Sequence, residues 1–102
     1  MPTPSFEAIR ILGHRLREAR RRIGLNQYDV AHESMVDAAN YGRLERGEGN
    51  PTLLTLLRLS VRLGVEPGEL LAGLNDQELL PEQARPFTVS EFRREQERRG
   101  NG

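Results

Sequence analysis

The fold is decided between Gln27 and Pro51, a stretch that reads QYDVAHESMVDAANYGRLERGEGNP. Asn26, just before it, and Asp37, inside it, are predicted helix N-cap residues. Their side chains can accept hydrogen bonds from the free N–H groups of a first helical turn. Gly47 can supply the left-handed residue that ends a helix. The stretch therefore predicts two short helices separated by a break near residues 34–36.

Small and apolar residues within this stretch suit two helices that cross. Ala31 is small at the point where the helices must approach closely, and Val36 is placed to pack under the break. Tyr41 and Leu44 lie three residues apart, so they share one edge of the second helix. We expect that edge to be buried.

The chain on either side is also predicted to be helical, because its apolar residues recur at steps of three and four. A first helix carries the stripe Phe6, Ile9, Leu12, Leu16, Ala19 and Ile23. Thr3 or Ser5 is expected to cap this helix and Gly24 to end it. Thr52 is expected to cap a fourth helix, which ends at Gly64 and carries Leu53, Leu56, Leu57, Leu59 and Leu63. Pro67 is expected to begin a fifth helix, with Leu70, Leu71 and Leu74 on its apolar face.

The sequence predicts one helical domain followed by a short appendage. Residues 5–75 carry the periodic apolar pattern, and no sustained alternation predicts a strand. Residues 76–86 are acidic and interrupted by Pro, which is typical of a linker, with one helical turn expected at 77–80. Residues 87–102 form a predicted C-terminal helical tail. The expected fold class is therefore all-α, with five helices and the tail.

The tail begins with the pattern of a capping box. Thr88 stands at the N-cap and Glu91 follows three residues later, while Phe87 and Phe92 stand where a hydrophobic staple would sit. The remainder of the tail is almost wholly charged, so the two Phe side chains have little to pack on there. We expect them to pack on a partner or back on their own domain.

Charge and composition narrow the function classes. The formal net charge is zero, from 15 Arg and 15 Asp plus Glu, although a nucleic-acid binder is usually basic. Six Arg nevertheless crowd residues 10–22, where Glu18 is the one acid, so the local field there is positive. There is no Cys, no membrane-length apolar run and no signal-peptide pattern. We therefore expect a cytoplasmic protein with no membrane partner, and a nucleoid-associated one should it bind DNA.

No pattern in the sequence predicts catalysis. There is no nucleophile–base pair, metal-ligand cluster or phosphate-binding loop. The acidic residues look like helix caps and solvated faces, and His14 and His32 lie on different predicted helices without an evident partner. We expect a protein that is not an enzyme and that binds no cofactor and no metal.

The segment 9–74 resembles the DNA-binding domain of the phage repressor and Cro family, the xenobiotic-response-element-like regulators. The residues that carry the resemblance are Gly24-Leu25-Asn26-Gln27, Ala31, Val36-Asp37, Leu44-Glu45-Arg46-Gly47, Pro51, Leu63-Gly64-Val65 and Leu70-Leu71. The resemblance implies five helices, of which the second and third form a helix-turn-helix. It also implies that the third helix, residues 38–45, enters the major groove of double-stranded DNA.

The resemblance further implies roles for individual side chains. It assigns base contacts to Ala38, Ala39 and Arg43, and phosphate contacts to Gln27, Asn40 and Arg46. Gln27 is also implied to brace the recognition helix. Arg43 can reach guanine O6 and N7 in a bidentate contact, whereas the two Ala side chains can touch only thymine methyl groups. The residues alone leave plainer roles open. Gln27 can be a polar residue at a helix start, Arg43 a solvent-facing side chain, and Arg46 a favourable charge near a helix C-terminus.

An ion pair between Arg20 and Glu45 is also implied. In the family, an Arg late in the first helix pairs with the Glu that ends the third, so the pair would fix the orientation of the recognition helix. We expect this pair to be partly buried and structural, in which case loss of one partner costs roughly 3–5 kcal/mol.

Three features depart from the family pattern. Ala38 and Ala39 carry no hydrogen-bonding side chain, so direct readout is expected to depend mostly on Arg43, Asn40 and DNA shape. Met35 stands in the turn where Gly is common, and a positive φ there would be strained. Gly42 stands inside the recognition helix, where Gly costs up to about 1 kcal/mol against Ala, and it would allow a backbone to approach closely.

Finally, the resemblance implies a homodimer on a palindromic operator, with half-sites about one helical turn apart. The expected dimer surface is the fourth and fifth helices together with the tail. One alternative is a helix-turn-helix protein-interaction module or co-activator with weak or indirect DNA binding. Another is a DNA-binding antitoxin whose Arg-rich tail neutralises a toxin. In both alternatives the protein partner would bind through the C-terminal tail.

Overall fold

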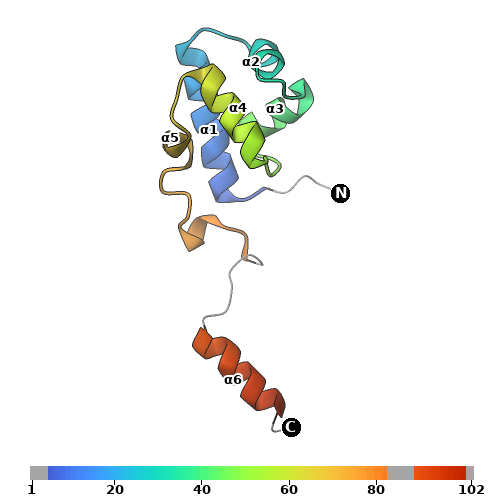
Figure 1. Ribbon diagram of the computed structural model, residues 1–102, viewed down its shortest axis with the longest axis vertical. Coiled ribbons are helices and arrows are strands. Elements are labelled where there is room, and N and C mark those ends of the chain that lie inside the picture. Colours follow the sequence, from blue (N-terminus) through green and yellow to red (C-terminus); the bar gives the residue numbers. More distant parts are fainter. Residues whose placement is uncertain (1–4, 83–88, 101–102) are drawn as a thin grey trace.

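The computed structural model describes residues 5–82 and 89–100 of the 102-residue chain (Figure 1). These residues form α1 (Glu7–Arg22), α2 (Gln27–Glu33), α3 (Ala38–Glu45), α4 (Leu53–Leu63), α5 (Pro67–Leu71), the 3₁₀ turn η1 (Gln77–Leu79) and α6 (Val89–Gly100). No strand occurs among them, so the predicted all-α class is confirmed.

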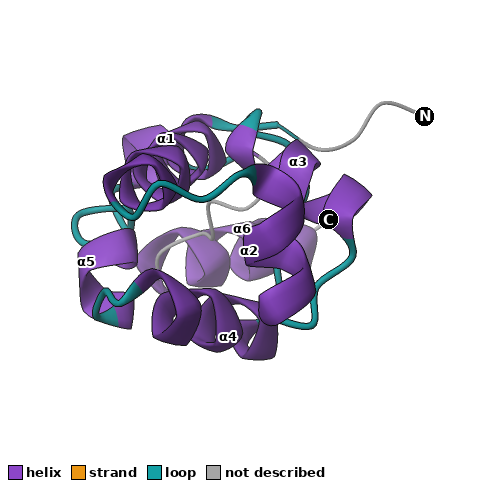
Figure 2. Ribbon diagram, turned by 90° about the horizontal axis from the view of Figure 1, so that it is seen from above, coloured by secondary structure: helices purple, strands orange, loops and turns teal. Residues whose placement is uncertain are grey.

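Helices α1 to α5 pack around one core. Seen from above, α1 and α4 lie on opposite sides, α5 closes one flank, and α2 with α3 closes the other (Figure 2). The buried apolar side chains inside this ring are Ile9, Leu12, Leu16, Ala19, Val30, Ala31, Tyr41, Leu44, Leu59, Leu63 and Leu70. Because α3 packs on α1 and α2 along one edge, its opposite side is left in solvent.

Local capping places three of the helix starts as predicted. The side chains of Asn26, Asp37 and Thr52 accept hydrogen bonds from backbone N–H groups three residues on, at 2.8, 3.0 and 3.1 Å. The start of α1 differs, because its N-cap residue is Phe6 and no side chain caps it. The Ser5 hydroxyl donates instead to the carbonyl of Gly47 at 3.0 Å, so the predicted Ser5 cap is wrong. Thr3 lies outside the described residues.

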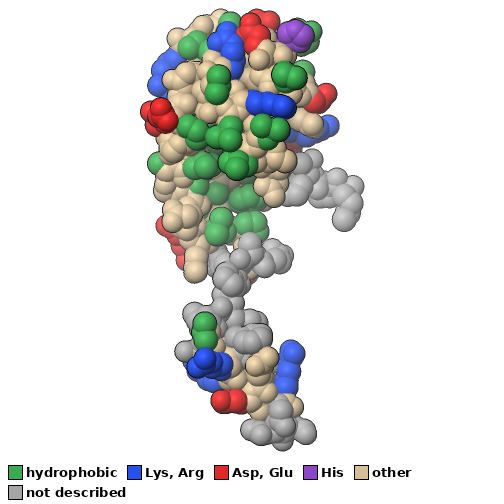
Figure 3. All heavy atoms as spheres, viewed as in Figure 1, with side chains coloured by type: hydrophobic (Ala, Val, Ile, Leu, Met, Phe, Trp, Pro, Cys, Tyr) green, Lys and Arg blue, Asp and Glu red, His purple; other side chains and the backbone are tan. Residues whose placement is uncertain are grey.

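The apolar stripes are only partly buried. On α1 the middle of the stripe is buried as predicted, whereas Phe6 is half-buried and Ile23, at the C-cap, is 41% exposed. On α4, Leu59 and Leu63 of the predicted stripe are buried, together with Ser60, and Leu56 is half-buried. The exposed apolar side chains of α4 are Leu53, Leu54, Leu57 and Val61, and we call them the α4 apolar face. Figure 3 shows hydrophobic side chains gathered on the side of the bundle that carries α4 in the view of Figure 1.

The described part of the appendage is helical. The turn expected near 77–80 is present as η1, where the Asp76 carboxylate accepts from the N–H of Glu78 at 2.9 Å. Helix α6 lies within the predicted tail. The expected capping box and staple lie outside the described residues and side chains. In the described ranges, no helix is long and apolar enough to cross a membrane, and no cluster of ligating side chains could hold a metal ion.

Candidate nucleic-acid interface

Helices α2 and α3 are joined by a sharp turn. The N–H of Val36 donates to the carbonyl of Ala31 at 2.9 Å, which closes the turn at the end of α2. Met35 has a φ of 58°, in the left-handed region that residues other than Gly seldom adopt. The turn therefore keeps a positive φ at this departure from the family pattern, although the residue is not Gly, and the Met35 side chain is exposed.

One side of α3 faces solvent. Ala38, Ala39 and Asn40 are exposed, and Arg43 is half-buried. The Asn40 Oδ1 accepts a hydrogen bond from Arg43 Nη1 at 2.5 Å. The opposite edge of the helix is buried through Tyr41 and Leu44, as predicted. The structure thus brings the expected base-contacting residues and Asn40 onto one exposed surface.

The other two expected phosphate-contacting residues lie where α2 meets α3. A Cβ added at Gly42 would lie 3.2 Å from Arg46 Nη1 and 3.5 Å from Gln27 Oε1. Gly42 therefore makes room for two side chains, and no backbone of another described element comes within 4 Å of that Cβ. Arg46 is exposed and forms an ion pair with Glu48 at 3.7 Å.

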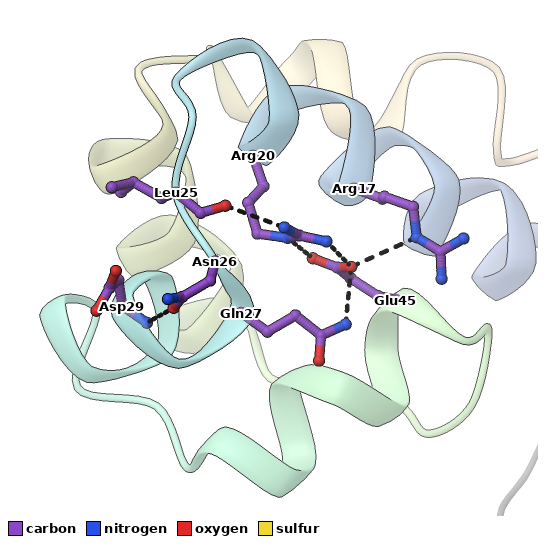
Figure 4. A network of polar contacts seen from close by, with 7 residues as sticks. All are labelled: Arg17, Arg20, Leu25, Asn26, Gln27, Asp29 and Glu45. Atoms are coloured by element: carbon purple, nitrogen blue, oxygen red, sulfur yellow. Dashed lines mark hydrogen bonds and ion pairs between the residues drawn. The ribbon is translucent and has the colours of Figure 1, made fainter.

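A buried polar network centres on Glu45, whose side chain is fully buried (Figure 4). Arg20 donates to both carboxylate oxygens, from Nε at 2.6 Å and from Nη2 at 2.9 Å. Its Nη1 donates to the carbonyl of Leu25 at 3.0 Å. Gln27 Nε2 donates to Glu45 Oε1 at 3.0 Å, and Arg17 Nε lies 3.5 Å from the same oxygen. The end of α3 is therefore tied to α1 and to the start of α2.

The charge of Glu45 is stabilised by its neighbours. Burial by itself raises the pKa of this carboxyl, but hydrogen bonding from Arg20 and the neighbouring polar groups of Tyr41 and Gln27 lower the pKa to about 2. Hydrogen bonding to Glu45 in turn raises the pKa of Arg20. Burial raises the pKa of Tyr41, whose hydroxyl lies near Glu45 without forming a regular hydrogen bond. The ion pair is therefore fully charged at neutral pH.

Gly13 is a positioning residue that the sequence analysis missed. A Cβ at this position would lie 2.2 Å from the carbonyl oxygen of Leu44 and 2.9 Å from that of Glu45. The backbones of α1 and α3 therefore touch, and a side chain at Gly13 would force them apart. The available signal was a Gly in the middle of an otherwise periodic helix, where it costs about 1 kcal/mol against Ala.

Arg15 also has an unpredicted structural role. Its Nη1 donates to the carbonyls of Leu70 at 3.0 Å and of Ala72 at 2.8 Å, at the end of α5. These hydrogen bonds fasten α5 to α1. The partners lie more than fifty residues further along the chain, so no local pattern could have identified them.

A family model described as helix-turn-helix matches residues 16–70, more than half of the chain. The chain belongs to the helix-turn-helix family of the phage repressor and Cro type. Within this helix-turn-helix domain, α2 and α3 are the paired helices, and the Glu45 network joins them to α1.

Two curated relatives share this domain. The HTH-type transcriptional regulator DdrOP3 of Deinococcus deserti is 38% identical over 63 residues, which are 62% of this chain and 49% of that protein. The uncharacterized HTH-type transcriptional regulator y4dJ of Sinorhizobium fredii is 37% identical over 62 residues, which are 61% of this chain and 80% of that protein. The chain thus spans about half the length of the Deinococcus regulator.

One solved structure adds a three-dimensional comparison. The restriction-modification controller protein C.AhdI from Aeromonas hydrophila is 40% identical, with a TM-score of 0.59 over 61% of this chain and 94% of that one. The family model, the two relatives and this solved structure agree that the chain carries a helix-turn-helix domain.

Proposed function

We propose that this protein regulates transcription by binding a specific sequence in double-stranded DNA, with α3 in the major groove. The observation that carries the proposal is that one side of α3 is exposed while the end of this helix is held in place by the buried Glu45 network. A recognition helix must hold its side chains at fixed positions relative to the base edges, and the hydrogen bonds of the Glu45 network supply that rigidity. The names of the two relatives and of C.AhdI support the same function.

Base readout in this proposal depends mainly on Arg43. A guanidinium can donate two hydrogen bonds to guanine O6 and N7, which discriminates against other bases by about 1–3 kcal/mol. Ala38 and Ala39 are exposed beside it and are candidates for contacts with thymine methyl groups. The candidates for phosphate contacts are Gln27, Asn40 and Arg46, which would set the position on the duplex without reading sequence.

The protein is further proposed to act as a homodimer on a palindrome. The α4 apolar face supports this, because Leu53 is 69% and Val61 is 83% exposed. Leu71 on α5 is also exposed, at 42%, although the sequence analysis assigned it to an apolar packing face. A second copy that covers these side chains would remove their apolar surface from water. The contribution of Phe87 and Phe92 to the dimer surface stays a prediction, since the structure does not describe their side chains.

The proposal is tested by selection from random duplex DNA, followed by fluorescence-anisotropy titrations of the enriched duplex and a scrambled one. We expect an enriched palindrome that the wild-type protein binds more tightly than the scramble. Arg43→Ala should abolish most of that preference, whereas Arg94→Ala removes the same charge from an exposed position of α6 and should leave it intact.

Failure of the selection would favour the alternative function. If no sequence is enriched and both duplexes bind alike or not at all, the helix-turn-helix serves as a protein-interaction module. The charged tail would then be the segment with which to search for a protein partner.

A further inference from the structure

Asn40 and Arg43 form a pair on the exposed side of α3. Asn40 Oδ1 accepts from Arg43 Nη1 at 2.5 Å, and the two residues are three positions apart on one helix. An Arg side chain has only donors, so the amide atom that faces it must be the oxygen. The pair therefore has a defined orientation before any DNA is present.

We infer that Asn40 is a positioning residue that holds the Arg43 guanidinium ready for a bidentate contact with guanine. This inference rests on the proposed function and deepens it, because it names the residue that prepares the reading side chain. It also replaces the phosphate contact that the family resemblance implies for Asn40.

The donors and acceptors of the pair are compatible with this role. A guanidinium has five N–H donors, and the contact with Asn40 occupies one, which leaves four for guanine O6 and N7. A bidentate contact of Asn with adenine needs Oδ1 to accept from the adenine amino group. The hydrogen bond from Arg43 uses one of the two lone pairs of Oδ1, so it restricts the direction from which an adenine amino group could approach Asn40.

The charges around Arg43 explain why a neutral acceptor is useful here. Arg43 lines a hollow of about 490 Å³ between α3 and the start of α4, together with Asp37 and Glu48. Among the described residues, neither carboxylate forms an ion pair with Arg43, and Glu48 pairs with Arg46. An amide oxygen orients the guanidinium but leaves its positive charge uncompensated, so that charge remains available to DNA.

The test is a double-variant cycle on the duplex enriched by selection. Wild type, Asn40→Ala, Arg43→Ala and the double variant are titrated against this duplex, the scramble, and duplexes with each base pair changed in turn. Asn75→Ala removes an exposed Asn outside α3 and serves as the matched control. Thermal melts by circular dichroism verify that every variant is folded.

We expect Arg43→Ala to lose discrimination at one G·C pair. Asn40→Ala should reduce the discrimination at that same base pair by a factor of about two to ten, because the Arg43 side chain must then be ordered on binding. Asn40→Ala should not change the affinity for the scrambled duplex. In the Arg43→Ala background it should cause no further loss of discrimination. Asn75→Ala should match wild type.

Three results would overturn the inference. If Asn40→Ala weakens binding equally to every duplex, and still does so in the Arg43→Ala background, Asn40 is a phosphate contact. If it reduces discrimination at a different base pair, Asn40 itself reads a base. Either result leaves the proposed function standing. If Arg43→Ala costs no discrimination anywhere, the base-reading part of the proposed function fails as well.

Discussion

Glu45→Gln is expected to cost about 3 kcal/mol of unfolding free energy at pH 7. In the folded protein the pKa of Glu45 is about 2, against an ordinary value of 4.5. At about 1.36 kcal/mol per pKa unit, the difference of 2.5 corresponds to about 3 kcal/mol in favour of the charged form. Gln has the shape of the protonated acid, so the variant lacks this stabilisation at every pH. The full burial of the Glu45 side chain leaves little solvent to screen the loss.

The pH dependence follows from the direction of the shift. A carboxyl whose pKa is lowered on folding stabilises the protein fully above its unfolded pKa, here about 4.5, and this stabilisation is lost as the pH falls towards about 2. The free-energy gap between wild type and Glu45→Gln should therefore be constant from pH 7 to about pH 5. Between about pH 4.5 and pH 2 it should shrink towards zero.

Urea unfolding followed by far-ultraviolet circular dichroism, at several pH values from 7 to 2, measures this gap. Glu18→Gln is the matched control, because Glu18 is exposed on α1 and its loss should change stability by less than about 0.5 kcal/mol. A Glu45→Gln cost below about 1 kcal/mol at pH 7 would refute the reasoning. A stability difference between wild type and Glu45→Gln that stays constant down to pH 2 would also refute it.

Three further predictions test the packing, the DNA contacts and the assembly. Gly13→Ala should destabilise the domain by about 3 kcal/mol or more. The reason is that the Ala Cβ would lie 2.2 Å from the Leu44 carbonyl oxygen, so the α1 and α3 backbones cannot both stay in place. A melting temperature within a few degrees of wild type would contradict this. Arg46→Ala should weaken binding to enriched and scrambled duplexes alike and reduce the slope of log K against log salt by about 1, whereas an unchanged slope would remove Arg46 from the phosphate contacts. Val61→Glu places a charge on the α4 apolar face and should shift the protein from dimer to monomer in sedimentation equilibrium. A dimer of undiminished affinity would place the interface elsewhere.

Much of the fold could be predicted because helix boundaries depend on nearby residues. A cap such as Asn26 or Asp37 bonds to an N–H group three residues away, so its role is readable from a short window of sequence. The buried edge of α3 was predictable for the same reason, since Tyr41 and Leu44 are neighbours on one helix turn.

The candidate site was only partly predictable. The family resemblance paired Arg20 with Glu45 and implied that Gln27 braces the recognition helix. The structure shows that Gln27 does so through the same carboxylate, and it adds Arg17 there. The hydrogen bond from Arg43 to Asn40 was not anticipated, although their spacing allows it. Spacing shows which side chains can meet on a helix, but rotamers and competing partners determine which of them do.

The sequence by itself determined the helices, the caps of α2, α3 and α4, and the family, because these depend on contacts within a few residues and on a recurring pattern of spacings. Only the tertiary structure decided that Gly13 lies against the α3 backbone, that Arg15 fastens α5, and that Ser5 bonds to Gly47 instead of capping α1. Each of these contacts joins residues more than thirty positions apart. Their existence depends on how the helices pack together, and packing is a property of the whole core that no local stretch of residues specifies.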